Sequence, residues 1–183
     1  MSGKINVWAI VSAHFGTIRH HGEDRLSIVD LTVFFICPLA IACLVFYARM
    51  PFGSSLISAL INASAILLGL LLNLLVLMFD LRSKASDDMD KLNGQKPLDE
   101  KRLGHLSLRC EVIDESVANI SFTVLLCIGS LISLLLFSMR EDAVGVDVIE
   151  SAAYAWNAFI WINVSLTIMM IIKRVFVLFE ASK

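Results

Sequence analysis

The sequence predicts an all-α integral membrane protein with four transmembrane helices, a cytoplasmic helical hairpin and an N-terminal amphipathic helix. Three observations lead to this fold class. Apolar residues make up 57% of the 183 residues and charged residues only 17%, against about 25% charged residues in a typical soluble domain. Four long segments contain no charge at all. The basic residues gather on one side of those segments, as the positive-inside rule describes for membrane proteins.

The four uncharged segments are the candidates for membrane spans. They cover residues 31–48, 52–79, 116–139 and 151–172. A helix needs about 20 apolar residues to cross roughly 30 Å of hydrocarbon, and tilt adjusts longer segments to that thickness. We therefore expect two transmembrane hairpins, one within residues 27–79 and one within residues 117–183, the second ending in a short tail.

The distribution of Lys and Arg predicts the orientation of these spans. Of the 15 basic residues, 13 lie before the first span, between the second and third spans, or after the fourth. The other two loops contain one each, Arg49 and Arg140. Because basic loops stay on the cytoplasmic side, both termini and the middle segment are expected in the cytoplasm, and the protein in a bacterial inner membrane.

Residues 1–26 form the predicted N-terminal segment, which has one apolar face. The apolar residues recur at spacings of three, four and three, as on one side of a helix: Trp8, Val11, Phe15 and Ile18. A face that carries Trp8 and Phe15 is typical of a helix lying in the headgroup layer. The alternative is that this helix packs against the cytoplasmic middle segment.

The residues that could take part in catalysis or bind a metal form no recognisable catalytic or metal site. His14, His20 and His21 lack a carboxylate or cysteine at a helical spacing that would complete a metal site, so we expect them to face solvent or headgroups. No nucleophile has a base at a suggestive spacing, and no span contains the charge that a proton relay or a charged-substrate site needs. We therefore expect no enzyme activity and no cofactor. No basic stripe predicts direct nucleic-acid binding.

Residues 80–116 are the predicted cytoplasmic hairpin. Asn93 and Gly94, followed by Pro97, mark a turn between two arms. Each arm should continue a membrane span without a break. The second arm has an apolar seam in a four-three rhythm, which can pack on the first arm, on a sister subunit or on a soluble partner: Leu103, Leu106, Cys110, Ile113 and Val117.

The second span has small and polar residues along one side: Ser58, Asn62, Gly69 and Asn73. Asn62 and Asn73 are eleven residues apart, which is about three helical turns. Such a stripe either packs helices together through small residues and hydrogen bonds or lines a pore between subunits. Because the stripe is uncharged, packing is the preferred interpretation.

This plan resembles the small membrane subunits of bacterial anti-phage systems, in particular the membrane subunit of the Kiwa system. The segments that prompt the resemblance are KINVW from Lys4, SIVD from Ser27, and GLLLNLLVLMFD from Gly69. The resemblance implies an inner-membrane homo-oligomer, a tetramer, that detects phage attachment or membrane disturbance. It also implies a soluble partner that docks on residues 80–92 and 103–113 and acts on phage DNA.

Three functions remain open at this point. The first is a non-enzymatic sensor or scaffold that binds a soluble cytoplasmic partner through Leu103, Leu106, Arg109 and Ile113. The second is a pore-forming or depolarising effector built around the stripe in the second span. The third is a transporter or membrane enzyme, against which the absence of charge within the spans argues.

Overall fold

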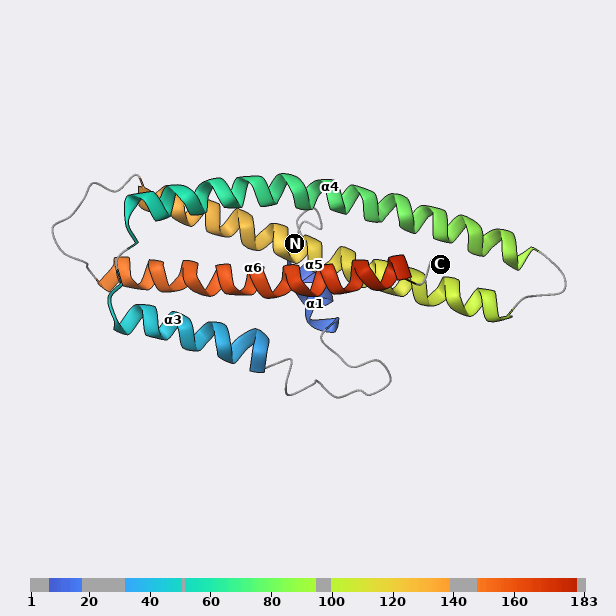
Figure 1. Ribbon diagram of the computed structural model, residues 1–183, viewed down its shortest axis with the longest axis horizontal. Coiled ribbons are helices and arrows are strands. Elements are labelled where there is room, and N and C mark those ends of the chain that lie inside the picture. The colour runs from blue at the N-terminus through green and yellow to red at the C-terminus, as the bar shows by residue number, and fades with distance from the viewer. Residues whose placement is uncertain (1–6, 18–31, 51, 95–99, 139–147, 181–183) are drawn as a thin grey trace.

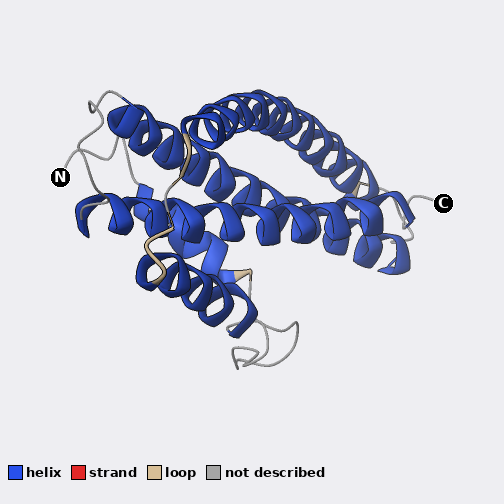
Figure 2. Cartoon of the chain, turned by 60° about the vertical axis from the view of Figure 1, so that its left-hand side comes forward, coloured by secondary structure: helices blue, strands red, loops and turns tan. Residues whose placement is uncertain are grey.

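The computed structural model describes residues 7–17, 32–50, 52–94, 100–138 and 148–180. Within these ranges the chain forms helices joined by short loops and contains no strand (Figure 2). The elements are a short N-terminal helix, a π-helical turn and four further helices: α1 (Val7–Gly16), η1 (Thr32–Ile36), α3 (Cys37–Tyr47), α4 (Ser54–Asn93), α5 (Glu100–Ser138) and α6 (Val148–Glu180).

The two longest helices, α4 and α5, form an antiparallel pair that runs the length of the molecule (Figure 1). With 40 and 39 residues, each is about 60 Å long at 1.5 Å per residue. Both run unbroken from an apolar half into a charged half, as the sequence predicts. α4 ends at Asn93, where the Gly94 N–H bonds to the Asp90 carbonyl at 3.3 Å.

The core lies where α4, α5 and α6 meet. Its fully buried residues come from all three helices and extend from the apolar halves into the charged halves of α4 and α5: Leu71, Met78, Ala85, Ile113, Ile120, Cys127, Ile160, Val164, Ile171 and Leu178. A second cluster joins α3 to the start of α6 through Ala42, Val45 and Ala155. α3 therefore lies along one half of α6, away from α4 (Figure 1).

Three helices are long and apolar enough to cross a membrane, within Ser54–Leu92, Lys101–Ser138 and Val148–Phe176. The segment expected as the first span forms η1 and α3, an apolar helix of only 16 residues over Thr32–Tyr47. At 1.5 Å per residue that is about 24 Å, short of roughly 30 Å of hydrocarbon. The structure thus supports a membrane protein with three candidate spans, and the fourth expected crossing is not shown.

Local features mark the start and the end of α3. The helix changes from π to α at Cys37, directly before Pro38, because proline has no N–H to continue the hydrogen-bond ladder. At the other end Arg49 has a φ of 47°, the left-handed conformation that terminates helices. The Met50 N–H then bonds back to the Val45 carbonyl at 3.3 Å, which closes the last turn.

Candidate functional site

A buried polar joint connects α1 to the helix bundle, and His14 is its centre. The His14 side chain is only 2% exposed. Its Nδ1 lies 2.7 Å from Oδ1 of Asn119 on α5. The imidazole also stacks on the ring of Phe122, with centroids 3.9 Å apart and planes within 9° of parallel. α1 is thus held on α5 by one hydrogen bond and one ring stack.

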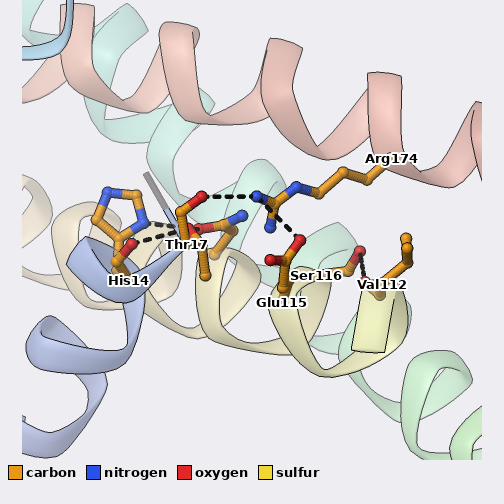
Figure 3. A network of polar contacts seen from close by, with 7 residues as sticks. His14, Thr17, Val112, Glu115, Ser116 and Arg174 are labelled. Carbon is orange, nitrogen blue, oxygen red and sulfur yellow. Dashed lines mark hydrogen bonds and ion pairs between the residues drawn. The ribbon is translucent and has the colours of Figure 1, made fainter. Parts of the chain in front are cut away.

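Thr17 and Arg174 close the joint at the end of α1 (Figure 3). The Thr17 hydroxyl lies 2.7 Å from the His14 carbonyl and 2.9 Å from Oδ1 of Asn119. Nη2 of Arg174, on α6, donates to the Thr17 carbonyl at 3.1 Å and pairs with Glu115 of α5 at 3.2 Å. A cation bound to an unpaired carbonyl at a helix C-terminus is favourable, so three helices are linked here.

Phe15 extends the joint toward η1. Its ring stacks on Phe35 at a centroid distance of 5.4 Å and lies 6.4 Å from Phe122. Aromatic pairs at such distances add about 0.5–1.5 kcal/mol beyond area burial. Phe15 therefore places the π-helical turn next to the same part of α5 that holds His14.

The joint favours a neutral imidazole. Burial lowers the pKa of His14 below its ordinary value; the hydrogen bond to Oδ1 of Asn119 opposes this shift in part, and the nearby Arg174 cation adds to it. Chemically, the joint is a structural linkage, because the Thr17 hydroxyl contacts the His14 carbonyl and not its ring. Among the described residues, no three His, Cys, Asp or Glu side chains could hold a metal.

The expectation that His14 faces solvent or headgroups is wrong, because the imidazole is buried on α5. Of the predicted apolar face, Trp8 is 77% exposed, whereas Val11 and Phe15 are half-buried. This face therefore turns only in part to the protein, and the interfacial role of Trp8 and Phe15 stays a prediction. Ile18, His20 and His21 lie outside the described residues. The signal that could have found the joint is Asn119, a polar residue in an apolar segment that needs a partner in lipid.

A second polar network lies deeper in the apolar region, between α5 and α6. Asn157 is 1% exposed, and its Oδ1 accepts from Ser133 at 3.0 Å and from Ser130 at 3.2 Å. Its Nδ2 donates to the Ala153 carbonyl at 3.0 Å, and the Trp161 indole donates to Ser130 at 3.1 Å. The polar residues of this seam join two helices.

The stripe on α4 is different, because it faces away from the rest of the chain. Its four members are all exposed: Ser58, Asn62, Gly69 and Asn73. Neither Asn62 nor Asn73 hydrogen-bonds through its side chain to any residue that the structure describes. In the most apolar 18-residue stretch of each helix, only 11% is buried in α4, against 28% in α5 and 39% in α6. The stripe is therefore not used by the part of the chain that the structure describes, and its packing or pore-lining role stays a prediction.

The charged arms of α4 and α5 pack on each other. Ile113 is 0% exposed and belongs to the core with Ala85, so we remove it from the predicted partner-binding set. Leu103, Leu106 and Arg109 are half-buried, and their partner-binding role stays a prediction. Arg82 of α4 forms an ion pair with Asp114 of α5 across the pair of arms.

Sequence reasoning missed the exposed apolar residue of the arm, Leu108, which is 53% exposed. It does not belong to the four-three seam, so periodicity points away from it. His105 and Glu111, one turn before and after it, are also exposed. Single exposed apolar residues are common on protein surfaces, so Leu108 by itself assigns no contact to the arm.

No family model, curated protein or solved structure matches the chain. The likeness to the Kiwa membrane subunit accordingly remains a resemblance in plan.

Proposed function

We propose that the chain is a non-enzymatic membrane scaffold and sensor that self-associates in the bilayer and recruits a soluble cytoplasmic partner. The observation that carries the proposal is the outer face of α4. Two amides lie there in the middle of an apolar helix without a hydrogen-bond partner among the described residues. In a bilayer, uncompensated polar groups usually face other helices, so a second copy is the occupant that we propose.

The geometry of that face suits close contact between two α4 helices. A Cβ added to Gly69 would meet no described atom within 4 Å, so this glycine is not required by packing within the chain. Small residues allow transmembrane helices to approach closely, and interhelical hydrogen bonds add about 0.6–2 kcal/mol each. In a parallel pair around a twofold axis, Asn62 meets Asn62 and Asn73 meets Asn73.

Cysteine crosslinking tests this interface directly. In a background without the four native cysteines, Asn62→Cys and Asn73→Cys should crosslink between chains in native membranes under mild oxidation. Ser64→Cys is the matched control, because Ser64 is fully buried on the inner side of the same helix. Equal crosslinking at Ser64, or none at Asn62 and Asn73, would contradict self-association through this face.

The arm supplies the proposed docking surface for the soluble partner. In the arms, the charged residues of α4 begin at Asp80 and those of α5 end before Ser116. About 14 residues of α4, or roughly 21 Å of helix, therefore extend past its apolar half. We propose docking around Leu108 with Leu103, Leu106 and Arg109 at its edge. The resemblance to Kiwa supports extending this to anti-phage defence in a bacterial inner membrane, with four crossings and both termini in the cytoplasm.

A pull-down in mild detergent tests the docking surface. Leu108→Asp should abolish recovery of the soluble protein that copurifies with the wild-type chain, while its exposed neighbour Ser107→Asp should leave recovery unchanged. Both substitutions are also made in the Asn62→Cys background, and both variants must insert and crosslink as that background does. If Leu108→Asp still recovers the same protein, the docking surface lies elsewhere.

A pore-forming or depolarising effector is the second candidate, and the same stripe favours it. Uncharged amides on one helix face could line a path between subunits. Dye or ion leakage from liposomes containing the purified protein would support this function. The double variant Asn62→Leu and Asn73→Leu should then abolish leakage, and leakage that persists would remove the stripe from the path.

A further inference from the structure

We propose that protonation of His14 releases α1 from α5, so that the joint makes the placement of the N-terminal helix depend on pH. This inference goes beyond the proposed scaffold, because it concerns a single chain and requires neither a partner nor self-association. It rests on the geometry around His14, on the hydrogen-bond donors at the joint and on the charges that face the imidazole.

The geometry leaves little room for a hydrated imidazolium. His14 is 2% exposed, and one face of its ring lies flat on Phe122. Asn119 is fully buried and is the one side chain that contacts a ring nitrogen among the described residues. A charged group taken out of water costs several kcal/mol unless partners replace its hydration. A neutral amide replaces only part of it.

The hydrogen bond at the joint needs only a neutral ring. Oδ1 of Asn119 lies 2.7 Å from Nδ1 of His14 and 2.9 Å from the Thr17 hydroxyl, so it accepts from an N–H at Nδ1. A neutral imidazole carries one N–H and leaves its other nitrogen as an acceptor. Nδ2 of Asn119 and Nη1 of Arg174 are already buried without an acceptor among the described residues, so the joint offers no spare acceptor for a further N–H.

Protonation adds a donor to the joint. An imidazolium carries N–H at both ring nitrogens, and no described residue accepts a hydrogen bond from Nε2 of His14, whose side chain is 2% exposed. A buried donor without an acceptor is destabilising. The cost falls on the docked position of α1, so release of α1 relieves it.

The charged groups around His14 act in the same direction. From α6, Arg174 repels an imidazolium. From α5, Glu115 attracts it, but this carboxylate is already paired with Arg174 at 3.2 Å. α1 itself and η1 contribute no other titratable side chain within Val7–Gly16 and Thr32–Ile36. The Phe122 ring offers a cation–π attraction, which offsets part of the burial cost.

The sign of the pH dependence follows from proton linkage. Docking lowers the pKa of His14, so released α1 binds more protons than docked α1. Above about pH 6.5, the ordinary pKa of histidine, protonation therefore does not oppose the docking of α1. Below that pH, the ratio of released to docked α1 rises about tenfold per pH unit until the docked imidazole itself titrates.

Electron–electron distance measurements on the full chain test the proposal. Spin labels at Ser12→Cys on α1 and Ser107→Cys on α5, in a background without native cysteines, report docked α1 as one narrow distance. Between pH 7.5 and 5.5, a second, broader population should grow relative to the first by up to about tenfold. A distribution that is the same at both pH values would overturn the proposal.

Three variants separate protonation of His14 from other effects of acid. His14→Asn keeps a neutral partner for Asn119 and should stay docked at both pH values, whereas His14→Lys should be released at both. Asn119→Asp supplies a carboxylate for the imidazolium and should keep α1 docked at pH 5.5. His105→Asn, at an exposed position of α5, is the matched control and should respond as the wild type does. A pH response that persists in His14→Asn would assign it to another group.

Discussion

The outer face of α4 and the seam between α5 and α6 both place asparagine side chains in an apolar region, yet they treat them in opposite ways. At the seam, Asn157 is buried and its amide meets hydroxyls of Ser130 and Ser133 and the Ala153 carbonyl. On α4, Asn62 and Asn73 are exposed. The same residue type completes the fold of one chain in the first region and leaves a surface for a further contact in the second.

This difference teaches how to separate structural from intermolecular polar residues in a membrane protein. A polar group in lipid must be satisfied by protein. Where one chain satisfies it, substitution should affect the stability of that chain. Where one chain does not, substitution should affect association and leave the fold intact. The following predictions test that distinction, beginning with the largest expected effect.

The two sides of α4 should differ most in their response to lost packing. Met78 is fully buried against α5 and α6, whereas its neighbour Leu77 is exposed. Met78→Ala should destabilise the chain by about 3 kcal/mol, because it leaves a cavity among close-packed helices. Leu77→Ala should cost less than about 0.5 kcal/mol. Unfolding in detergent measures both, and equal losses would mean that the two sides are not distinct.

Removal of one asparagine amide should have the second-largest effect, with a loss of stability at the seam between α5 and α6 and none on the outer face of α4. Asn157→Ala breaks contacts with two serine hydroxyls and should cost about 2 kcal/mol, given about 0.6–2 kcal/mol for each interhelical hydrogen bond in a membrane. Asn62→Ala should leave the stability of the monomer within about 0.5 kcal/mol. The same unfolding measurement applies to both variants. A loss at Asn62 as large as that at Asn157 would show that Asn62 is satisfied within one chain.

The two ion pairs should also differ in their contribution to stability, because one is mostly buried and the other is exposed. Arg174 and Glu115 are mostly buried at the joint. Glu115→Gln should destabilise the chain by about 1–2 kcal/mol, because it leaves the guanidinium with a weaker acceptor. High salt should change this loss little, since buried pairs are poorly screened. A loss that vanishes in 1 M salt would place the pair at the surface.

The exposed pair between Arg82 and Asp114 should give the smallest effect. Both side chains are about half exposed, and surface ion pairs contribute about 0–1 kcal/mol. Asp114→Asn should therefore cost about 0.5 kcal/mol, and 1 M salt should remove that difference. Unfolding at low and high salt measures it. A loss above that of Glu115→Gln would reverse the assignment of the two pairs.

Length and apolar content predicted the helical class and the long uncharged helices, because these properties depend on residues close together in the chain. The turn at Asn93 and Gly94 was predicted for the same reason. The burial of His14 could not be predicted, since its partner Asn119 lies 105 residues away. The inward position of Ile113 and the exposure of Leu108 likewise depend on how α5 rotates against α4. The short α3 depends on the left-handed backbone at Arg49.

The unbroken passage of α4 from Ser54 to Asn93 has a mechanical consequence. A continuous helix has no hinge between its apolar and charged halves, so it turns as one rigid rod. Helices tilt when the thickness of the surrounding bilayer changes. A tilt of about 10° would displace the end of an arm of roughly 21 Å by about 4 Å relative to the membrane surface. Thinning or stretching of the membrane would thus be transmitted as a sideways movement of the surface around Leu108.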